Sequence, residues 1–348
     1  MRLWEEVRAA GVDAGLDAIG VARAEPFLST RRHLVERKAA GLHGGMHFTY
    51  ADPEKATDPA RALPGARTLV VGARSYRAAT PAPPNRPAGR VARYSWRDHY
   101  EPLRRALGSV ARCLEAHGQA AVVLVDDNRL VDREAAVRAG LGWYGKNGNV
   151  LLDGHGSWFV LGSVVTDAAL PATTIPVADG CGACTRCLPA CPTGALVAPG
   201  VLDARRCLAH LLQAPGDFPL EFRAALGDRL YGCDDCQEVC PPNRLEDRRH
   251  PPPPAADGDE AWVPVLEVLA ASDDELLARH GRWYIPRRQP RYLRRNALVV
   301  LGNVGDGGDP DVEAALRRAL SDPDPMLRSH AAWAAARLGR PDLVAASA

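Results

Sequence analysis

Eight of the nine cysteines fall in two short segments of the chain, and their spacing is that of iron–sulfur ligands. Residues 181–192 follow the pattern C-x2-C-x2-C-x3-C-P, in which the fourth cysteine binds the other cluster of a two-cluster ferredoxin. Cys240 is also followed by proline, so we expect Cys191 and Cys240 to serve opposite clusters. The predicted ligand sets are Cys181, Cys184, Cys187 and Cys240 for one 4Fe–4S cluster, and Cys191, Cys207, Cys233 and Cys236 for the other.

Such clusters transfer single electrons at low potential. Zinc is one alternative, because zinc sites also use paired CxxC spacings, but the CPTGA turn and the prolines after Cys191 and Cys240 are not expected of two zinc sites. Disulfides need an oxidising compartment, and the N-terminal run MRLWEEVRAAGVDAGLDAIG does not resemble a signal peptide, since charges interrupt its apolar positions. Cys113 lies in an expected helix and is predicted to be a core thiol.

Length and composition indicate an ordinary globular protein with more than one domain. At 348 residues the chain is long for one hydrophobic core. Hydrophobic residues make up 46% and charged residues 24%, as in soluble proteins. No apolar run approaches the ~20 residues of a membrane span, so we expect a cytoplasmic protein with no membrane contact. The net charge of +1 says nothing about partners.

Three parts follow one another along the chain. Residues 1–175 are predicted to form a mixed α/β domain, in which residues 78–90 are a proline-rich loop. Residues 176–245 form a ferredoxin-like module, and residues 246–348 a linker with helical repeats. The expected strands of the first domain are the β-branched apolar runs at 68–76, 120–127 and 158–167.

The last part contains an internal repeat. LRRNALVVLGN at 293–303 is echoed by LRSHAAWAAARLG at 327–339, so that the shared LRxxA recurs after 34 residues. This period is typical of helical solenoids such as HEAT-like repeats. Two repeats are too few to stand alone, so we expect them to pack on the preceding domain. The predicted fold class is therefore α+β and multidomain.

Arginines are concentrated in the same part, where no acidic residue lies between Glu275 and Asp306. Trp283, Tyr284 and Tyr292 are interleaved with them. Arginine with aromatic side chains suits contact with phosphates and unstacked bases, although a solvated helix face has a similar composition. The candidate RNA-binding residues are Arg287, Arg288, Arg291, Arg294 and Arg295.

Asp126 is the carboxylate with the best placement for chemistry, because it ends the expected strand AAVVLV. A carboxyl group against an apolar wall can have a raised pKa and donate a proton near neutrality. Alternatively, Asp126, Asp127 and Asn128 form only a turn or a helix cap. GLGWYG at 140–145 reads as G-x-G-x-x-G, but an expected helix precedes it where a dinucleotide site requires a strand.

Together these stretches resemble epoxyqueuosine reductase, a family of cobalamin-dependent iron–sulfur enzymes that complete the queuosine base in tRNA. The resemblance extends over nearly the whole chain, including both cysteine groups and the repeat tail. The runs that carry it are GLHGGM (41–46), LPGARTLVV (63–71), YSWRDHY (94–100), AGLGWYGKN (139–147), GSWFVLG (156–162) and GCDDCQEVCPPN (232–243).

The resemblance implies that electrons pass from two 4Fe–4S clusters to cobalamin, whose own nucleotide base is displaced from cobalt. VDDNRLVDR (125–133) occupies the place of the family's catalytic run, which puts Asp126 on the catalytic aspartate and Arg133 on the final arginine. The expected substrate is tRNA carrying epoxyqueuosine, the expected electron donor a flavodoxin or ferredoxin, and the expected state a monomer. The candidate cofactor-binding residues are Asp126, Lys146, Asn147, Ser157 and Trp158.

Several positions depart from the family pattern near the expected substrate pocket. Two alternatives therefore stay open: a corrinoid iron–sulfur reductase with a different substrate, and a ferredoxin-type electron carrier. The large N-terminal domain argues against the carrier, which needs only the cysteine module. The departures are Asn128 and Arg129 in place of a small residue and proline, Asp98-His99-Tyr100 for DYH, AHLLQA at 209–214, and CPPN after the last cysteine.

Overall fold

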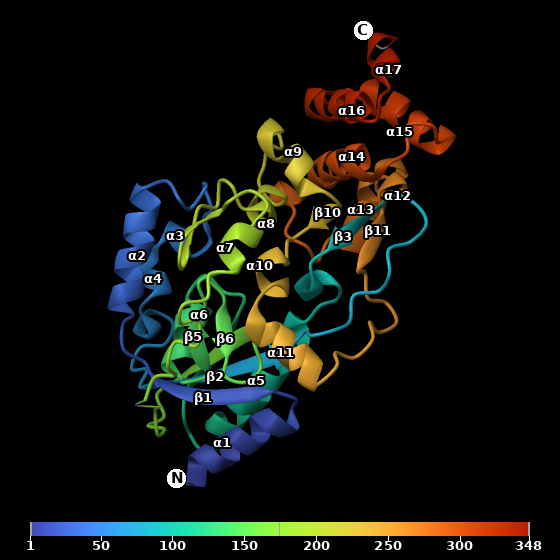
Figure 1. Cartoon of the computed structure of the whole chain (residues 1–348). Coiled ribbons are helices and arrows are strands. Elements are labelled where there is room, and N and C mark those ends of the chain that lie inside the picture. Colours follow the sequence, from blue (N-terminus) through green and yellow to red (C-terminus); the bar gives the residue numbers. More distant parts are fainter. Residues whose placement is uncertain (1, 174, 347–348) are drawn as a thin grey trace.

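The computed structural model describes residues 2–173 and 175–346. Its N-terminal part is built on an antiparallel sheet in the strand order β1-β2-β7-β4. The strands are β1 (Ala18–Arg23), β2 (Thr68–Ser75), β7 (Phe159–Thr166) and β4 (Ala121–Val125). Figure 1 shows this sheet at one end of the molecule and the C-terminal helices at the other. The three strands expected from the apolar runs are β2, β4 and β7.

Alternating side chains of β2 build two cores, because successive residues of a strand point to opposite faces. Val70 packs with α1 (Arg2–Asp13) and α5 (Tyr100–Ala116) on one face. Leu69 and Val71 pack with α6 (Asp132–Arg138) on the other face. The sheet thus carries α5 and α6 on opposite sides of the end of β4, where Asp126 follows.

The first expected loop contains a strand. Residues 88–90, placed in the loop by their prolines, belong to β3 (Ala88–Val91). It pairs parallel to β10 (Arg229–Tyr231) and antiparallel to β11 (Trp262–Pro264). Gly89 is required there, because a Cβ atom would lie 2.4 Å from Cβ of Leu230. The sheet β10-β3-β11 therefore takes one strand from each of the three expected parts.

Short elements make up the rest of the first two parts. The segment GLGWYG leads from α6 into a hairpin of β5 and β6, as its lack of a preceding strand indicated. The remaining elements are α2 (Leu28–Ala39), α3 (Phe48–Ala51), α4 (Pro53–Ala56), β5 (Gly142–Tyr144), β6 (Val150–Leu152), α7 (Cys187–Ala190), β8 (Leu196–Ala198), β9 (Val201–Leu202), α8 (Leu208–Leu211), α9 (Leu220–Leu226), α10 (Asp235–Glu238) and α11 (Pro241–Arg249).

Helices form the C-terminal part: α12 (Val265–Ala270), α13 (Asp273–His280), α14 (Arg291–Val304), α15 (Pro310–Leu320), α16 (Pro325–Arg337) and α17 (Pro341–Ala345). Asp309 and Asp324 cap α15 and α16, each accepting a backbone N–H two residues on and each followed by proline at the first helical position. The repeated LRxxA falls on α14 and α16. Within the described residues, no helix is both long and apolar enough to cross a membrane.

The α14 helix is fixed to the cysteine module by Arg295, whose side chain is completely buried. Its guanidinium donates hydrogen bonds to the backbone carbonyls of Leu211 (3.0 Å), Ala214 (2.8 Å) and Gly216 (2.6 Å). Burial lowers the pKa of Arg295 to about 10. The prediction that Arg295 contacts RNA is therefore wrong: it lies on the inward side of α14 and binds the chain that follows α8.

We expect Arg295→Leu to destabilise the protein by roughly 3 kcal/mol, because several buried carbonyl groups would lose their donor. Thermal unfolding of the purified protein measures this, with Arg287→Leu as the matched control because Arg287 is exposed. Equal Tm values for the two variants would contradict the role of Arg295.

Candidate active site and cluster-binding module

The structure gathers the cysteines of the module into two groups. Cys187 and Cys240 are both in electrostatic contact with Cys181 and Cys184. The four also line one partly open cavity, together with Pro241 and Pro242. The α7 helix begins at Cys187 and α11 begins directly after Cys240, so two short helices bring distant parts of the chain to this group, here called the first cysteine set.

The second cysteine set consists of Cys191, Cys207, Cys233 and Cys236. Cys207 is in electrostatic contact with Cys191, and Cys233 with Cys207. Cys236 is in contact with Cys191, Cys207 and Cys233. The structure thus brings Cys191 to the later cysteines and Cys240 to the earlier ones, which is the exchange that the two proline-flanked cysteines predict.

Burial keeps the thiols of both sets protonated unless they bind a metal. Burial raises the pKa of Cys240 to about 11 and that of Cys233 to about 12, whereas a coordinating metal deprotonates a thiol outright. Within residues 2–173 and 175–346, no three His, Cys, Asp or Glu side chains are close enough to share a single metal ion. Each set brings together four cysteines, the number of ligands that a 4Fe–4S cluster takes.

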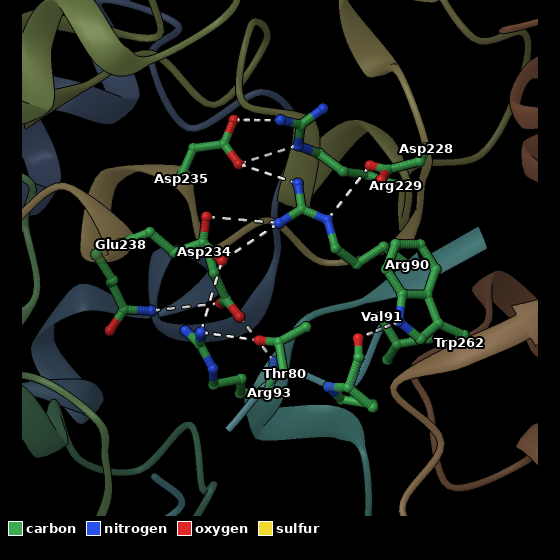
Figure 2. A network of polar contacts seen from close by, with 12 residues as sticks. Thr80, Arg90, Val91, Arg93, Asp228, Arg229, Asp234, Asp235, Glu238 and Trp262 are labelled. Atoms are coloured by element: carbon green, nitrogen blue, oxygen red, sulfur yellow. Dashed lines mark hydrogen bonds and ion pairs between the residues drawn. The ribbon is translucent and has the colours of Figure 1, made fainter. Parts of the chain in front are cut away.

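Ion pairs hold the loop between Cys233 and Cys236 (Figure 2). The carboxylate of Asp235 accepts hydrogen bonds from Arg229 at 2.5 and 3.1 Å and lies 3.5 Å from Arg90. Arg229 belongs to β10 and Arg90 to β3. The ligand loop is therefore attached to the small sheet by charge-assisted hydrogen bonds, which are stronger than neutral ones.

A second, buried network joins the same loop to the N-terminal sheet. Asp234 accepts the backbone N–H of Arg93 at 2.8 Å. Gln237 accepts hydrogen bonds from the hydroxyls of Tyr76 (3.3 Å) and Ser157 (2.9 Å). Asn243 donates to the Ser157 hydroxyl at 3.0 Å. Residues between and after the cluster cysteines thus fix the module against β2 and the start of β7.

This network corrects two of the predicted cofactor contacts. Ser157 is 4% exposed and Trp158 2% exposed. Trp158 lies under the guanidinium of Arg93, which is 4.3 Å from its ring centroid, and meets Tyr76 edge to face. The GSW run serves as packing between sheet and module, so neither side chain reaches a surface on which a cofactor could lie.

Lys146 and Asn147 also serve the cluster loops. The Lys146 ammonium donates to the carbonyl of Gly182 at 2.6 Å, beside the first cysteine set. The Asn147 amide donates to the carbonyl of Cys236 at 3.3 Å, within the second set. Both residues line the cavity at the first cysteine set. The turn GKN therefore lies between the two sets and contacts the backbone of each.

Asp126 stands at the end of β4 with a left-handed backbone, at φ +51°, a region that is unfavourable for residues other than glycine. It is exposed, yet partial burial of the carboxyl raises its pKa, and the neighbouring Asp127 adds to this while Arg104 opposes it. Asp127 is bound by Arg129 at 2.6 Å, which holds its pKa below the usual range. Arg129, one of the departures from the family pattern, therefore pairs with the adjacent carboxylate and keeps it ionised.

Tyr100 and Asp132, near Asp126, were not selected by sequence reasoning as site residues, and Arg133 was identified only as the final arginine of the run VDDNRLVDR. The charges of Asp126 and Asp132 add to the burial that raises the pKa of Tyr100. Arg133 is in electrostatic contact with Tyr100 and Asp132, and also with Cys207 of the second cysteine set. The signal was present in YSWRDHY and VDDNRLVDR, which end in Tyr100 and Arg133, but only the fold brings these runs together.

The remaining candidate arginines differ in what they can contact. Arg287 and Arg288 are exposed, with left-handed backbones at φ +50° and +53°, and the nearby Tyr284 is 64% exposed. Arg291 pairs with Asp324 at 3.1 Å and keeps 42% of its side chain exposed, whereas Arg294 pairs with Asp273 and keeps 17%. The exposed candidates are thus gathered just before α14.

Family models match three segments of the chain. Residues 57–127 match the model described as epoxyqueuosine reductase QueG, DUF1730. Residues 180–243 match a 4Fe-4S double cluster binding domain, and residues 284–346 match HEAT repeats. These matches confirm the predicted fold class, an α+β chain with a two-cluster module and a helical-repeat tail.

Curated relatives match over nearly their whole length. The epoxyqueuosine reductase of Xanthomonas campestris is 36% identical, over 96% of this chain and 95% of its own. That of Bacillus cereus is 34% identical, over 97% of this chain and 90% of its own. A crystal structure of epoxyqueuosine reductase with a tRNA-Tyr epoxyqueuosine-modified stem loop has a TM-score of 0.89 and 34% identity, covering 99% of this chain and 93% of that one. The chain, with its two cysteine sets and with Asp126 at the end of β4, therefore belongs to the epoxyqueuosine reductase family.

Proposed function

We propose that this protein reduces epoxyqueuosine to queuosine in tRNA. The observation that carries the proposal is the agreement of nearly the whole chain, at a TM-score of 0.89, with a relative whose solved structure includes an epoxyqueuosine-modified tRNA stem loop. The surroundings of Asp126 support it, because Asp126 and Arg133 both interact electrostatically with Tyr100, and Arg133 also interacts with Cys207 of the second cysteine set. The cytoplasm, where tRNA is modified, is the proposed location.

The cofactors of this proposal are two 4Fe–4S clusters and cobalamin, which when bound supply low-potential single electrons and a reduced metal centre at the epoxide. The eight cysteines of the two sets hold the clusters. The first set lines a partly open cavity, so an external flavodoxin or ferredoxin reaches this set. Cys207 of the second set is in electrostatic contact with Arg133, so the second set lies on the side of Asp126.

Asp126 is the general acid of the proposed reaction. The oxygen that leaves an epoxide must be protonated, and a carboxyl with a raised pKa still carries its proton closer to neutral pH. Partial burial and the negative charge of Asp127 both act in this direction on Asp126. Tyr100 interacts electrostatically with Asp126 and with Arg133, and these side chains supply the other polar groups of the proposed site.

The tRNA is held by the exposed residues before α14. Arg287 and Arg288 supply positive charge for phosphates, and Tyr284 offers a ring on which a base can stack. We propose a monomer in which residues 1–175 hold the corrinoid and Asp126, residues 176–245 the clusters, and residues 246–348 the RNA-binding surface.

Asp126→Asn should retain both clusters and lower the conversion of epoxyqueuosine by about 100-fold or more, because the amide cannot donate the proton. Anaerobic turnover with a chemical reductant, followed by mass spectrometry of the digested nucleosides, measures this. Asp13→Asn, at the exposed end of α1, is the matched control. A loss of the same size in both variants would remove the special role of Asp126.

Arg287→Glu with Arg288→Glu should weaken tRNA binding about tenfold or more and reduce its dependence on salt, because phosphate contacts are lost. A binding titration at two salt concentrations measures both effects. Arg337→Glu on α16 is the control, because Arg337 is also exposed on the tail. Unchanged affinity in the double variant would place the RNA elsewhere.

The exchange of cysteines between clusters is tested by iron content. Cys181→Ser with Cys240→Ser should cost about four irons per chain, since both belong to one cluster, and Cys191→Ser with Cys240→Ser about eight. Iron analysis and electron paramagnetic resonance of the reduced protein distinguish them. If the cysteines instead bound in sequence order, Cys181 and Cys240 would belong to different clusters, and Cys181→Ser with Cys240→Ser would also cost about eight irons.

A further inference from the structure

The proposed reaction consumes more protons than Asp126 carries. Removing an epoxide oxygen as water breaks two C–O bonds, forms one C=C bond, and takes up two electrons and two protons. A single carboxyl supplies one proton at a time. Asp126 is exposed in the free protein and solvent can protonate it there, but a substrate base bound over it would close that route.

Asp132 is a partly buried carboxyl that interacts electrostatically with Asp126. It is the first residue of α6, and its Oδ1 atom is out of contact with solvent and without a hydrogen-bond partner among the described residues. A buried carboxylate without such partners is costly, whereas a protonated carboxyl is not. The position of Asp132 is fixed, because the neighbouring N–H of Val131 donates to the carbonyl of Ala56 at 3.0 Å.

The charged and titratable groups that face Asp132 are few. Asp126 and Asp127 come from the loop before α6, Arg133 from α6 itself and Tyr100 from α5. Burial is the main cause that raises the pKa of Asp132 well above its usual value, the two aspartates add to it, and Arg133 opposes it. Asp127 stays ionised in its ion pair with Arg129, so Asp126 and Asp132 are the two carboxyls of this segment whose pKa values are raised.

We propose that Asp132 is the proton-supplying partner of Asp126, so that the two carboxyls together deliver both protons of one turnover while the substrate covers the site. This inference rests on the proposed function. In the balanced step, one proton passes from Asp126 to the departing oxygen and the proton of Asp132 replaces it on Asp126. The second proton then leaves Asp126 to complete water, and the two electrons come from the external low-potential donor.

The test is the pH profile of epoxyqueuosine reduction in protein loaded with its cofactors. Asp132→Asn keeps the size of the side chain but carries no transferable proton. It should approach the wild-type rate at acidic pH, where solvent protons are abundant, and fall at least about tenfold below it at pH 8. Its alkaline limb should move to lower pH, because Asp126 can then be reprotonated only from solvent.

Two further variants complete the design. Asp132→Glu restores a carboxyl and should restore the alkaline limb, and Glu115→Gln, an exposed carboxyl at the far end of α5, should leave the profile unchanged. If Asp132→Asn does not retain its clusters, Asp132→Ser repeats the test with a smaller side chain. A loss in Asp132→Asn that is equal at every pH would show a merely structural role and overturn the inference.

Failure of the inference is distinct from failure of the proposed function. If the wild-type protein converts epoxyqueuosine and Asp126→Asn does not, the proposed function stands whatever Asp132 does. If the wild-type protein gives no queuosine with clusters and cobalamin bound, the proposed function fails first. In that case the ionisation of Asp132, followed in the resting protein by infrared spectroscopy of its carboxyl, still decides whether it holds a proton at neutral pH.

Discussion

The arginine–carboxylate contacts between β3 and the loop of Cys233 and Cys236 are the interaction on which the rest of the structure depends. The cysteine module consists of short helices and loops, so its ligand positions are set by groups outside it. Arg90 and Arg229 of the small sheet β10-β3-β11 are such groups, because both bind the carboxylate of Asp235. Paired charges with little exposure are stable only as a complete network. Because β3 belongs to the first part of the chain and β10 to the second, the cluster loop forms only when both parts are folded.

The three parts of the chain also share one hydrophobic core. A single hydrophobic cluster includes Val91 of β3, Phe218 of the module and Val300 of α14. Arg295 adds buried hydrogen bonds from the tail to the module. The repeat tail is therefore not a flexible attachment, and the exposed arginines before α14 hold a fixed distance from Asp126. A substrate that binds both has its reacting base placed by the fold.

Local patterns in the sequence were sufficient for much of this fold. Apolar β-branched runs identified β2, β4 and β7, and the LRxxA repeat identified α14 and α16, because strand and helix periodicity are local. The pairing of β3 was not predictable from residues 78–90, since it depends on distant strands and on the space that Gly89 leaves for Leu230. Arg287 and Arg295 were equivalent in sequence, and only tertiary packing separates an exposed arginine from a buried one. Asp132 could not be selected from the sequence either, because its Oδ1 atom is buried only by the packing of the folded chain.

The left-handed backbone at Asp126 has a consequence for how this protein balances stability against chemistry. An aspartate in this conformation is less favourable than a glycine by roughly 1 kcal/mol, and its partly buried carboxyl adds a further cost. A glycine at this position would relax the backbone and remove the acid. At the position of the proposed proton donor, selection for stability alone would therefore favour glycine over aspartate. Natural variation at this position should be limited by activity and not by folding.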